Sequence, residues 1–174
     1  MISLISAIGS IGTFIMALFY IVSISIQFYQ MKIEFIPALG FNQTLLSRDN
    51  KNQLYLLNTS ARESKHEDFL RLYNLGGGAA KEIKIEIYLD GGKTIQTKYV
   101  NILPSKEGYL LPINRWVFDE LNKSIDSRTE QSNIKIKISY NHYVSRKTNV
   151  ITYRAYIDDF NEYNDRDIYE LQFV

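Results

Sequence analysis

The hydrophobic positions of the chain follow two different patterns. Residues 1–31 contain no charged side chain, and their apolar core runs from about Leu4 to Ile26. A helix that crosses a hydrocarbon layer of about 30 Å needs about 20 apolar residues. The polar and aromatic residues Gln27–Gln30 come next and Lys32 follows, as is typical where a helix leaves a membrane. Residues 1–31 therefore predict one transmembrane helix with its interfacial end.

Two other structures compete for this segment. A cleaved signal peptide has a basic start and an apolar run of about 7–15 residues, and this segment has neither. A buried helix of a soluble protein is the second alternative, and 31 uncharged residues disfavour it. Basic side chains occur only after the helix, beginning at Lys32. The positive-inside rule then predicts a single-pass protein of the cell membrane with its C-terminal domain, residues 32–174, in the cytoplasm.

The remainder of the chain alternates between apolar and polar residues with a period of two, which is typical of β-strands. Glu82–Leu89 is the clearest case, and residues 42–66 are predicted to form a polar loop around one short strand. Arg115–Ser124 has the spacing of a short helix. The fold expected is mainly β: an immunoglobulin-like β-sandwich, or a small closed β-barrel, of about seven or eight strands. Nine segments could contribute these strands, namely Ile33–Phe41, Leu54–Asn58, Phe69–Leu75, Glu82–Leu89, Thr94–Leu103, Tyr109–Ile113, Ile134–Tyr140, Asn149–Ile157 and Ile168–Phe173.

Few residues offer chemistry for catalysis or metal binding. The chain has no cysteine, and its two histidines, His66 and His142, have no partners at ligand spacing. Gly76–Gly78 is followed by a strand and lacks the Lys-Ser/Thr pair of a phosphate-binding loop. We interpret it as a strand-to-strand crossover in which glycine permits positive φ. We therefore expect no enzyme, no metal and no cofactor.

One face of the predicted membrane helix carries small residues. Small side chains four apart let two membrane helices approach closely, and hydroxyls bond across the contact. This pattern predicts a homo-oligomer, although small residues are also common in membrane helices that do not associate. The candidate helix contact comprises Ser6, Gly9, Ser10, Thr13 and Ala17, and Ser23 and Gln27 extend it as a polar stripe.

Charge is unevenly distributed although the net charge is only +1. Between Asp158 and Glu170 there are six acidic residues and one basic residue, which predicts a docking strip for a basic protein partner. Its candidates are Asp158, Asp159, Glu162 and Asp165. A face for anionic membrane lipid is predicted from Lys32, Lys81, Lys84, Lys135 and Lys137. The alternatives are a solubilising loop and solvated strand faces. No direct nucleic-acid binding is expected, because the total charge is near neutral.

The stretch Leu70–Ile85 resembles a pattern of many small prokaryotic membrane proteins. In these a strand ends in Asn-x-Gly-x-Gly-x-Ala, here Asn74–Ala80, and isoleucines alternate in the next strand. Asn101–Gly108 is similar to the turn that follows. The resemblance implies one membrane helix before an immunoglobulin-like domain, and it identifies no individual functional residue.

Some proteins of this layout are membrane effectors of antiviral defence systems, including those that accompany short Argonautes and cyclic-nucleotide signalling. There a sensor recruits the effector, which permeabilises or depolarises the membrane. The resemblance thus implies an effector that oligomerises in the membrane. The alternative is a passive adaptor that holds a partner complex at the membrane.

Overall fold

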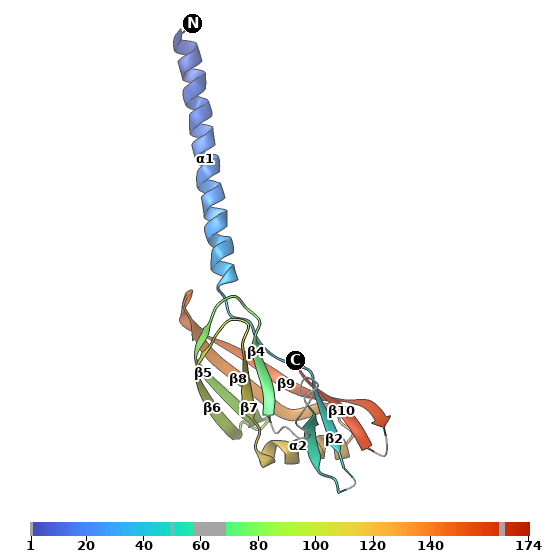
Figure 1. The fold of residues 1–174 in the computed structure, drawn as a ribbon. Coiled ribbons are helices and arrows are strands. Elements are labelled where there is room, and N and C mark those ends of the chain that lie inside the picture. Colours follow the sequence, from blue (N-terminus) through green and yellow to red (C-terminus); the bar gives the residue numbers. More distant parts are fainter. Residues whose placement is uncertain (1, 50, 58–68, 164–165) are drawn as a thin grey trace.

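A long helix precedes a β-rich domain in the computed structural model of the chain (Figure 1). The structure describes residues 2–49, 51–57, 69–163 and 166–174, without the side chains of 2, 4–7, 146, 159–163, 166 and 167. The helix α1 (Ile2–Glu34) extends away from the domain. Its segment Ile8–Glu34 is apolar and long enough to cross a membrane, and none of it is buried. The predicted N-terminal helix is confirmed, with an end three residues beyond Met31.

The domain is a sandwich of two antiparallel sheets that contain ten strands among the described residues. The small sheet has the order β1-β4-β7, and the large sheet has the order β3-β2-β10-β9-β8-β5-β6. The strands are β1 (Leu39–Phe41), β2 (Thr44–Arg48), β3 (Leu54–Leu57), β4 (Phe69–Asn74), β5 (Ala80–Leu89), β6 (Thr94–Leu103), β7 (Gly108–Pro112), β8 (Gln131–His142), β9 (Ser145–Tyr163) and β10 (Arg166–Phe173). The predicted β-sandwich is confirmed. It has more strands than expected. The alternative of a closed barrel is wrong, because the large sheet has two edges, at β3 and β6.

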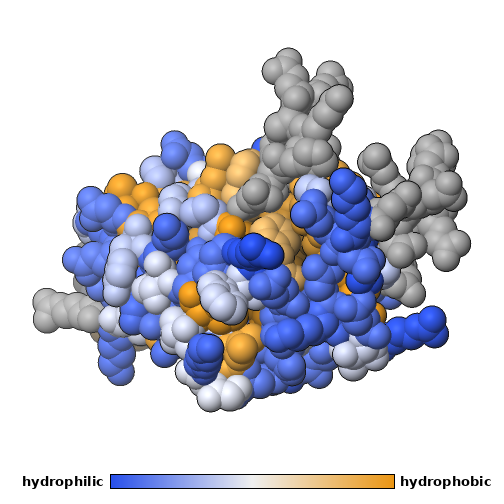
Figure 2. Space-filling model, turned by 90° about the horizontal axis from the view of Figure 1, so that it is seen from below, coloured by the Kyte–Doolittle hydropathy of each residue, from blue (hydrophilic) through white to orange (hydrophobic). Residues whose placement is uncertain are grey.

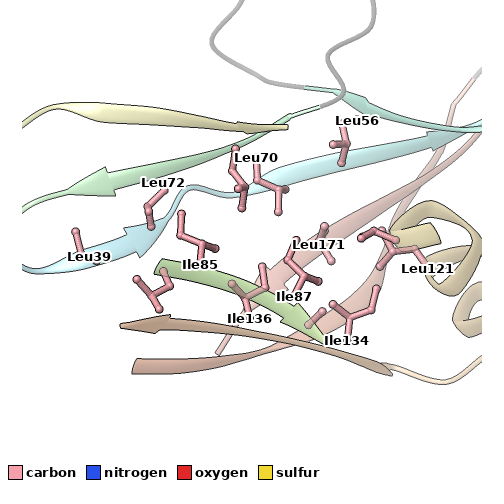
Figure 3. Packing of buried hydrophobic residues seen from close by; sticks show 14 of the residues in the cluster. Leu39, Leu56, Leu70, Leu72, Ile85, Ile87, Leu121, Ile134, Ile136 and Leu171 are labelled. Carbon is pink, nitrogen blue, oxygen red and sulfur yellow. The ribbon is translucent and has the colours of Figure 1, made fainter. Parts of the chain in front are cut away.

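Alternate residues of facing strands form the core (Figure 3). In β5 and β8 every second residue is a buried isoleucine, from Ile83 to Ile87 and from Ile134 to Ile138. Leucines of the small sheet, such as Leu70 and Leu72, cover them from the other side. This arrangement follows from the period-two pattern, because successive side chains of a strand point to opposite faces.

The predicted soluble helix is present as α2 (Arg115–Asp126). The side chain of Asn114 caps its start by accepting a hydrogen bond from the backbone N–H of Val117 at 3.1 Å. Val117 and Leu121 are buried, and Leu121 points toward the core at Ile134 (Figure 3). The helix thus covers the end of the sandwich that lies far from α1 (Figure 1).

Two expected segments differ in the structure. The first predicted strand, Ile33–Phe41, is helix as far as Glu34, and only Leu39–Phe41 pairs with β4. Residues 42–66 were expected to form a polar loop around one strand, and β2 occupies part of them. Its residues Thr44 and Ser47 are polar but buried, because β2 lies between β10 and β3. The expectation of a loop was therefore wrong for β2. Its polar residues did not reveal a strand, because their burial depends on its neighbours β3 and β10 in the sheet.

The core should respond to truncation as a packed interior does. Ile138 is fully buried in β8, whereas Val150 of the neighbouring strand β9 is exposed. Ile138→Ala is expected to lower the free energy of unfolding by about 2–5 kcal/mol, because it removes buried apolar surface and leaves a cavity. Val150→Ala should change it by about 0.5 kcal/mol or less. Thermal unfolding of the full chain in detergent measures both, and equal losses would contradict the core assignment.

Candidate functional site

The junction between α1 and the domain brings two backbone segments into close contact. The backbone of Glu34–Ala38 lies directly against Gly76–Gly78, the loop between β4 and β5. A Cβ on Gly77 would overlap the carbonyl oxygen of Glu34, and one on Gly78 would overlap that of Phe35. None of these three glycines has the positive φ that we expected of the loop; among the described glycines only Gly92 has it. The three glycines are needed because two backbones approach closely.

The side chain of Asn74 connects three segments that meet at this junction: the residues after α1, the β4–β5 loop and the end of β6. It has no exposed surface. Its Oδ1 accepts hydrogen bonds from the backbone N–H groups of Ala38 and Gly76, both at 3.2 Å. Its Nδ2 donates toward three carbonyl oxygens, those of Gly78 at 2.7 Å, Leu103 at 3.2 Å and Pro104 at 3.1 Å. A buried amide needs all its polar atoms bonded, so this side chain fixes the positions of its partners.

Backbone hydrogen bonds complete the junction. The N–H of Leu75 donates to the carbonyl oxygen of Ala38 at 2.8 Å, and the N–H of Lys106 donates to that of Asn74 at 2.8 Å. The hydroxyl of Ser105 donates to the carbonyl oxygen of Gly76 at 2.6 Å. Pro37 is buried within these contacts. The base of α1 is therefore fixed to the domain rather than joined by a flexible linker.

The predicted helix contact lies on α1, with no part of the domain close to it. Gly9, Ser10, Thr13 and Ala17 are exposed on the helix, and the side chain of Ser6 lies outside the described residues. The hydroxyl of Thr13 donates to the carbonyl oxygen of Gly9 at 2.9 Å, and Gln27 Nε2 donates to Ser23 Oγ at 3.4 Å. The polar groups are thus partly satisfied within the helix itself.

The predicted lipid face divides into two groups. Lys32 lies near the end of α1, and Lys81 is the second residue of β5, beside the junction. The other three lie farther along the large sheet. Lys84 Nζ pairs with Glu86 at 2.6 Å, Lys135 Nζ pairs with Asp90 at 2.5 Å, and Lys137 is the strand neighbour of Glu86. The hydrogen bond with Glu86 raises the pKa of Lys84, and that from Lys135 lowers the pKa of Asp90. These acids offset the positive charge of the second group.

The predicted acidic docking strip belongs to a hairpin and not to a loop. Asp158, Asp159 and Glu162 lie in β9, which pairs with β10, and Asp165 lies outside the described residues. Asp158 is exposed and is the strand partner of Glu170. Directly opposed like charges disfavour pairing. Glu170 Oε1 accepts a hydrogen bond from Gln43 Nε2 at 2.7 Å.

Only one of the two histidines lies among the described residues. His66 lies outside the described residues. His142 is buried, and its Nδ1 accepts a hydrogen bond from the N–H of Val144 at 3.3 Å in the β8–β9 turn. Within the described part of the chain, no three histidine, aspartate or glutamate side chains gather as a metal-binding group would.

The sequence analysis did not identify Asn74 as the residue whose side chain connects the segments of the junction. The signal was available in part, because three consecutive glycines after an asparagine indicate a close backbone approach. The segment that approaches the loop is about 40 residues away in the sequence, and it becomes visible only in the fold.

Comparison of the chain with protein-family models, with curated proteins and with solved structures finds no match.

The junction makes Gly77 much less replaceable than a turn glycine. Gly77→Ala should lower the free energy of unfolding by about 1–3 kcal/mol, because its Cβ meets the backbone of Glu34. It should also increase protease cleavage between α1 and the domain. Gly91→Ala is the matched control, since a Cβ there meets no atom within 4 Å. Thermal unfolding and limited proteolysis of the full chain measure both effects, and equal behaviour of the two variants would contradict the tight junction.

Proposed function

We propose that the chain is a membrane-anchored effector of a prokaryotic antiviral defence system. A partner recruits it through the β-domain, and the helices then associate and permeabilise or depolarise the cell membrane. The observation that carries the proposal is the fixed junction. Because Glu34–Ala38 hold the end of α1 against the domain, an arrangement imposed on several domains is passed on to their helices. A passive tether does not need such a connection.

The small-residue face of α1 supplies the surface for that association. Gly9 has no neighbouring atom within 4 Å of a Cβ position, so the domain does not occupy this face. Small residues spaced by four let helix backbones approach. The proposal therefore includes a homo-oligomer whose helices meet along Gly9, Thr13 and Ala17.

Recruitment is assigned to the β9–β10 hairpin. It places the exposed carboxylate of Asp158 opposite Glu170, and Figure 1 shows the hairpin extending from the side of the domain. A basic surface on a cytoplasmic sensor protein complements this charge. The proposed orientation, with the domain in the cytoplasm, follows from the basic residues after α1. The proposal assigns the chain no catalysis, cofactor or nucleic-acid contact.

The alternative function is a passive adaptor that holds a partner complex at the membrane. The hydrogen bonds within α1 favour it. Thr13 and Ser25 donate to the carbonyl oxygens of Gly9 and Ile21 at 2.9 and 2.8 Å. Hydroxyls satisfied in this way permit a helix to remain alone in lipid. The two functions differ in whether the helix sequence matters once the chain is anchored.

A substitution on the small-residue face separates the two functions. Gly9→Leu should abolish depolarisation, because its side chain holds neighbouring helices apart. Gly12→Leu is the matched control and points about 100° away from the centre of this face. A potential-sensitive dye in cells that express the chain with its genetic neighbours measures the effect. If the wild-type chain leaves the potential unchanged, the effector function fails. Equal effects of the two substitutions would contradict the proposed face.

A flexible insertion tests the role of the junction. A Gly-Gly-Ser-Gly insertion between Lys32 and Ile33 should abolish depolarisation while the chain stays in the membrane. The same insertion at Gly91, in the β5–β6 turn, leaves the junction intact and should preserve activity. Membrane fractionation and the dye assay provide the two readouts. An adaptor would tolerate both insertions, so retained activity after the first insertion would exclude coupling through the junction.

A further inference from the structure

Exposed apolar and aromatic side chains surround the base of α1. Phe35 and Ile36, which follow the last helical residue, are 56% and 40% exposed. Leu75 at the end of β4 is 75% exposed, and Tyr143 in the β8–β9 turn is 78% exposed. Single exposed residues of this kind are common on soluble proteins. Four around one membrane helix call for a shared explanation.

Contacts place these side chains at the same end of the domain. The N–H of Leu75 bonds to the carbonyl oxygen of Ala38, and Gly78 lies against the backbone of Phe35. Lys81 follows closely in the chain, and its Nζ lies 3.2 Å from the centre of the Tyr143 ring. Figure 1 shows the β4–β5 loop and the β8–β9 turn beside the lower end of α1.

Basic side chains accompany the apolar ones. Lys81 lies over Tyr143, and Lys106 is exposed in the β6–β7 turn, where its N–H bonds to the carbonyl oxygen of Asn74. Tyrosine is enriched at membrane interfaces because its ring is apolar and its hydroxyl is polar. Lysine suits the same layer, since its stem covers apolar groups while its ammonium reaches water or lipid phosphate.

The length of α1 agrees with a position of these side chains at the membrane interface. The helix α1 has 33 residues, which gives a length of about 50 Å. A bilayer with its headgroup layers is about 40–45 Å thick. A helix of this length that is tilted by about 30° spans about 43 Å along the bilayer normal, which leaves Glu34 and the residues after it at the headgroup layer. The junction and the side chains around it then meet the lipid surface.

We infer that the domain is seated on the membrane through a collar made of Phe35, Ile36, Leu75 and Tyr143 with Lys81 and Lys106. The collar occupies the headgroup layer of the bilayer that holds α1. The boundary with water thus lies at the junction, and not at Gln27–Lys32 as the sequence indicates. This inference rests on the proposed anchorage of the chain in the membrane, but not on its proposed effector activity.

The opposite end of the domain has a different surface. Seen from the side away from α1, the surface is mostly hydrophilic with small hydrophobic patches between (Figure 2). The single tryptophan, Trp116, belongs to α2 at that end and is 69% exposed. Tyr99, near the middle of the edge strand β6, is 74% exposed. These two positions match the collar in exposure and differ from it in distance from α1.

Tryptophan fluorescence of the full chain in phosphatidylcholine vesicles tests the inference. Trp116→Phe removes the natural signal, and Tyr143→Trp or Leu75→Trp then reports from the collar. We expect blue-shifted emission and quenching by phosphatidylcholine brominated near the top of its acyl chains. The matched Tyr99→Trp variant, and the natural Trp116, should instead be quenched by iodide in the water and not by the brominated lipid.

The outcomes distinguish the collar from the anchor. Flotation of the chain with the vesicles reports the anchorage separately. If both collar variants float but respond only to iodide, as Tyr99→Trp does, the seated domain is excluded while the anchor stands. If the chain does not float with the vesicles, the anchorage fails and the collar fails with it. Both collar positions are exposed, so folding is expected to survive either change, and thermal unfolding checks this.

Discussion

The close approach of two backbones at the base of α1 is the constraint on which the arrangement of this molecule depends. Gly76–Gly78 leave no room for a Cβ against Glu34–Ala38, and Asn74 satisfies the polar groups that this contact buries. A contact of this kind has two consequences. It fixes the direction in which the helix leaves the domain, and it fixes which loops surround the helix at that point.

The sandwich provides the support for this contact. Asn74 ends β4 in the small sheet, whereas Leu103, which it also bonds, ends β6 at the edge of the large sheet. The amide therefore bridges the two sheets at the end nearest α1. The core isoleucines of β5 and β8 hold the large sheet in register, so a loss of core packing would be transmitted to the junction. Stability of the domain and orientation of the helix are thus properties of one connected structure.

A fixed helix links the proposed function to the proposed seat on the membrane. When the collar rests in the headgroup layer, the domain has one preferred orientation relative to the bilayer. The hairpin of β9 and β10 then points to the same side in every copy of the chain. A partner that binds several hairpins would bring the small-residue faces of α1 into a defined relation. In that case the depth at which the domain sits in the headgroup layer contributes to the specificity of helix association.

Sequence and tertiary structure determined different parts of this picture. The uncharged N-terminus determined a helix long and apolar enough to cross a membrane, and the alternating isoleucines determined the strands and the sandwich, because both are local patterns of apolar residues. The polar strand β2 was hidden from such patterns, since its burial depends on β3 and β10. The glycines after Asn74 were interpreted as permitting positive φ, whereas in the structure they permit a close backbone approach, and their spacing does not indicate which segment approaches. Which backbone lies against a glycine, and which side chains share its end of the domain, is decided by contacts between residues far apart in the chain.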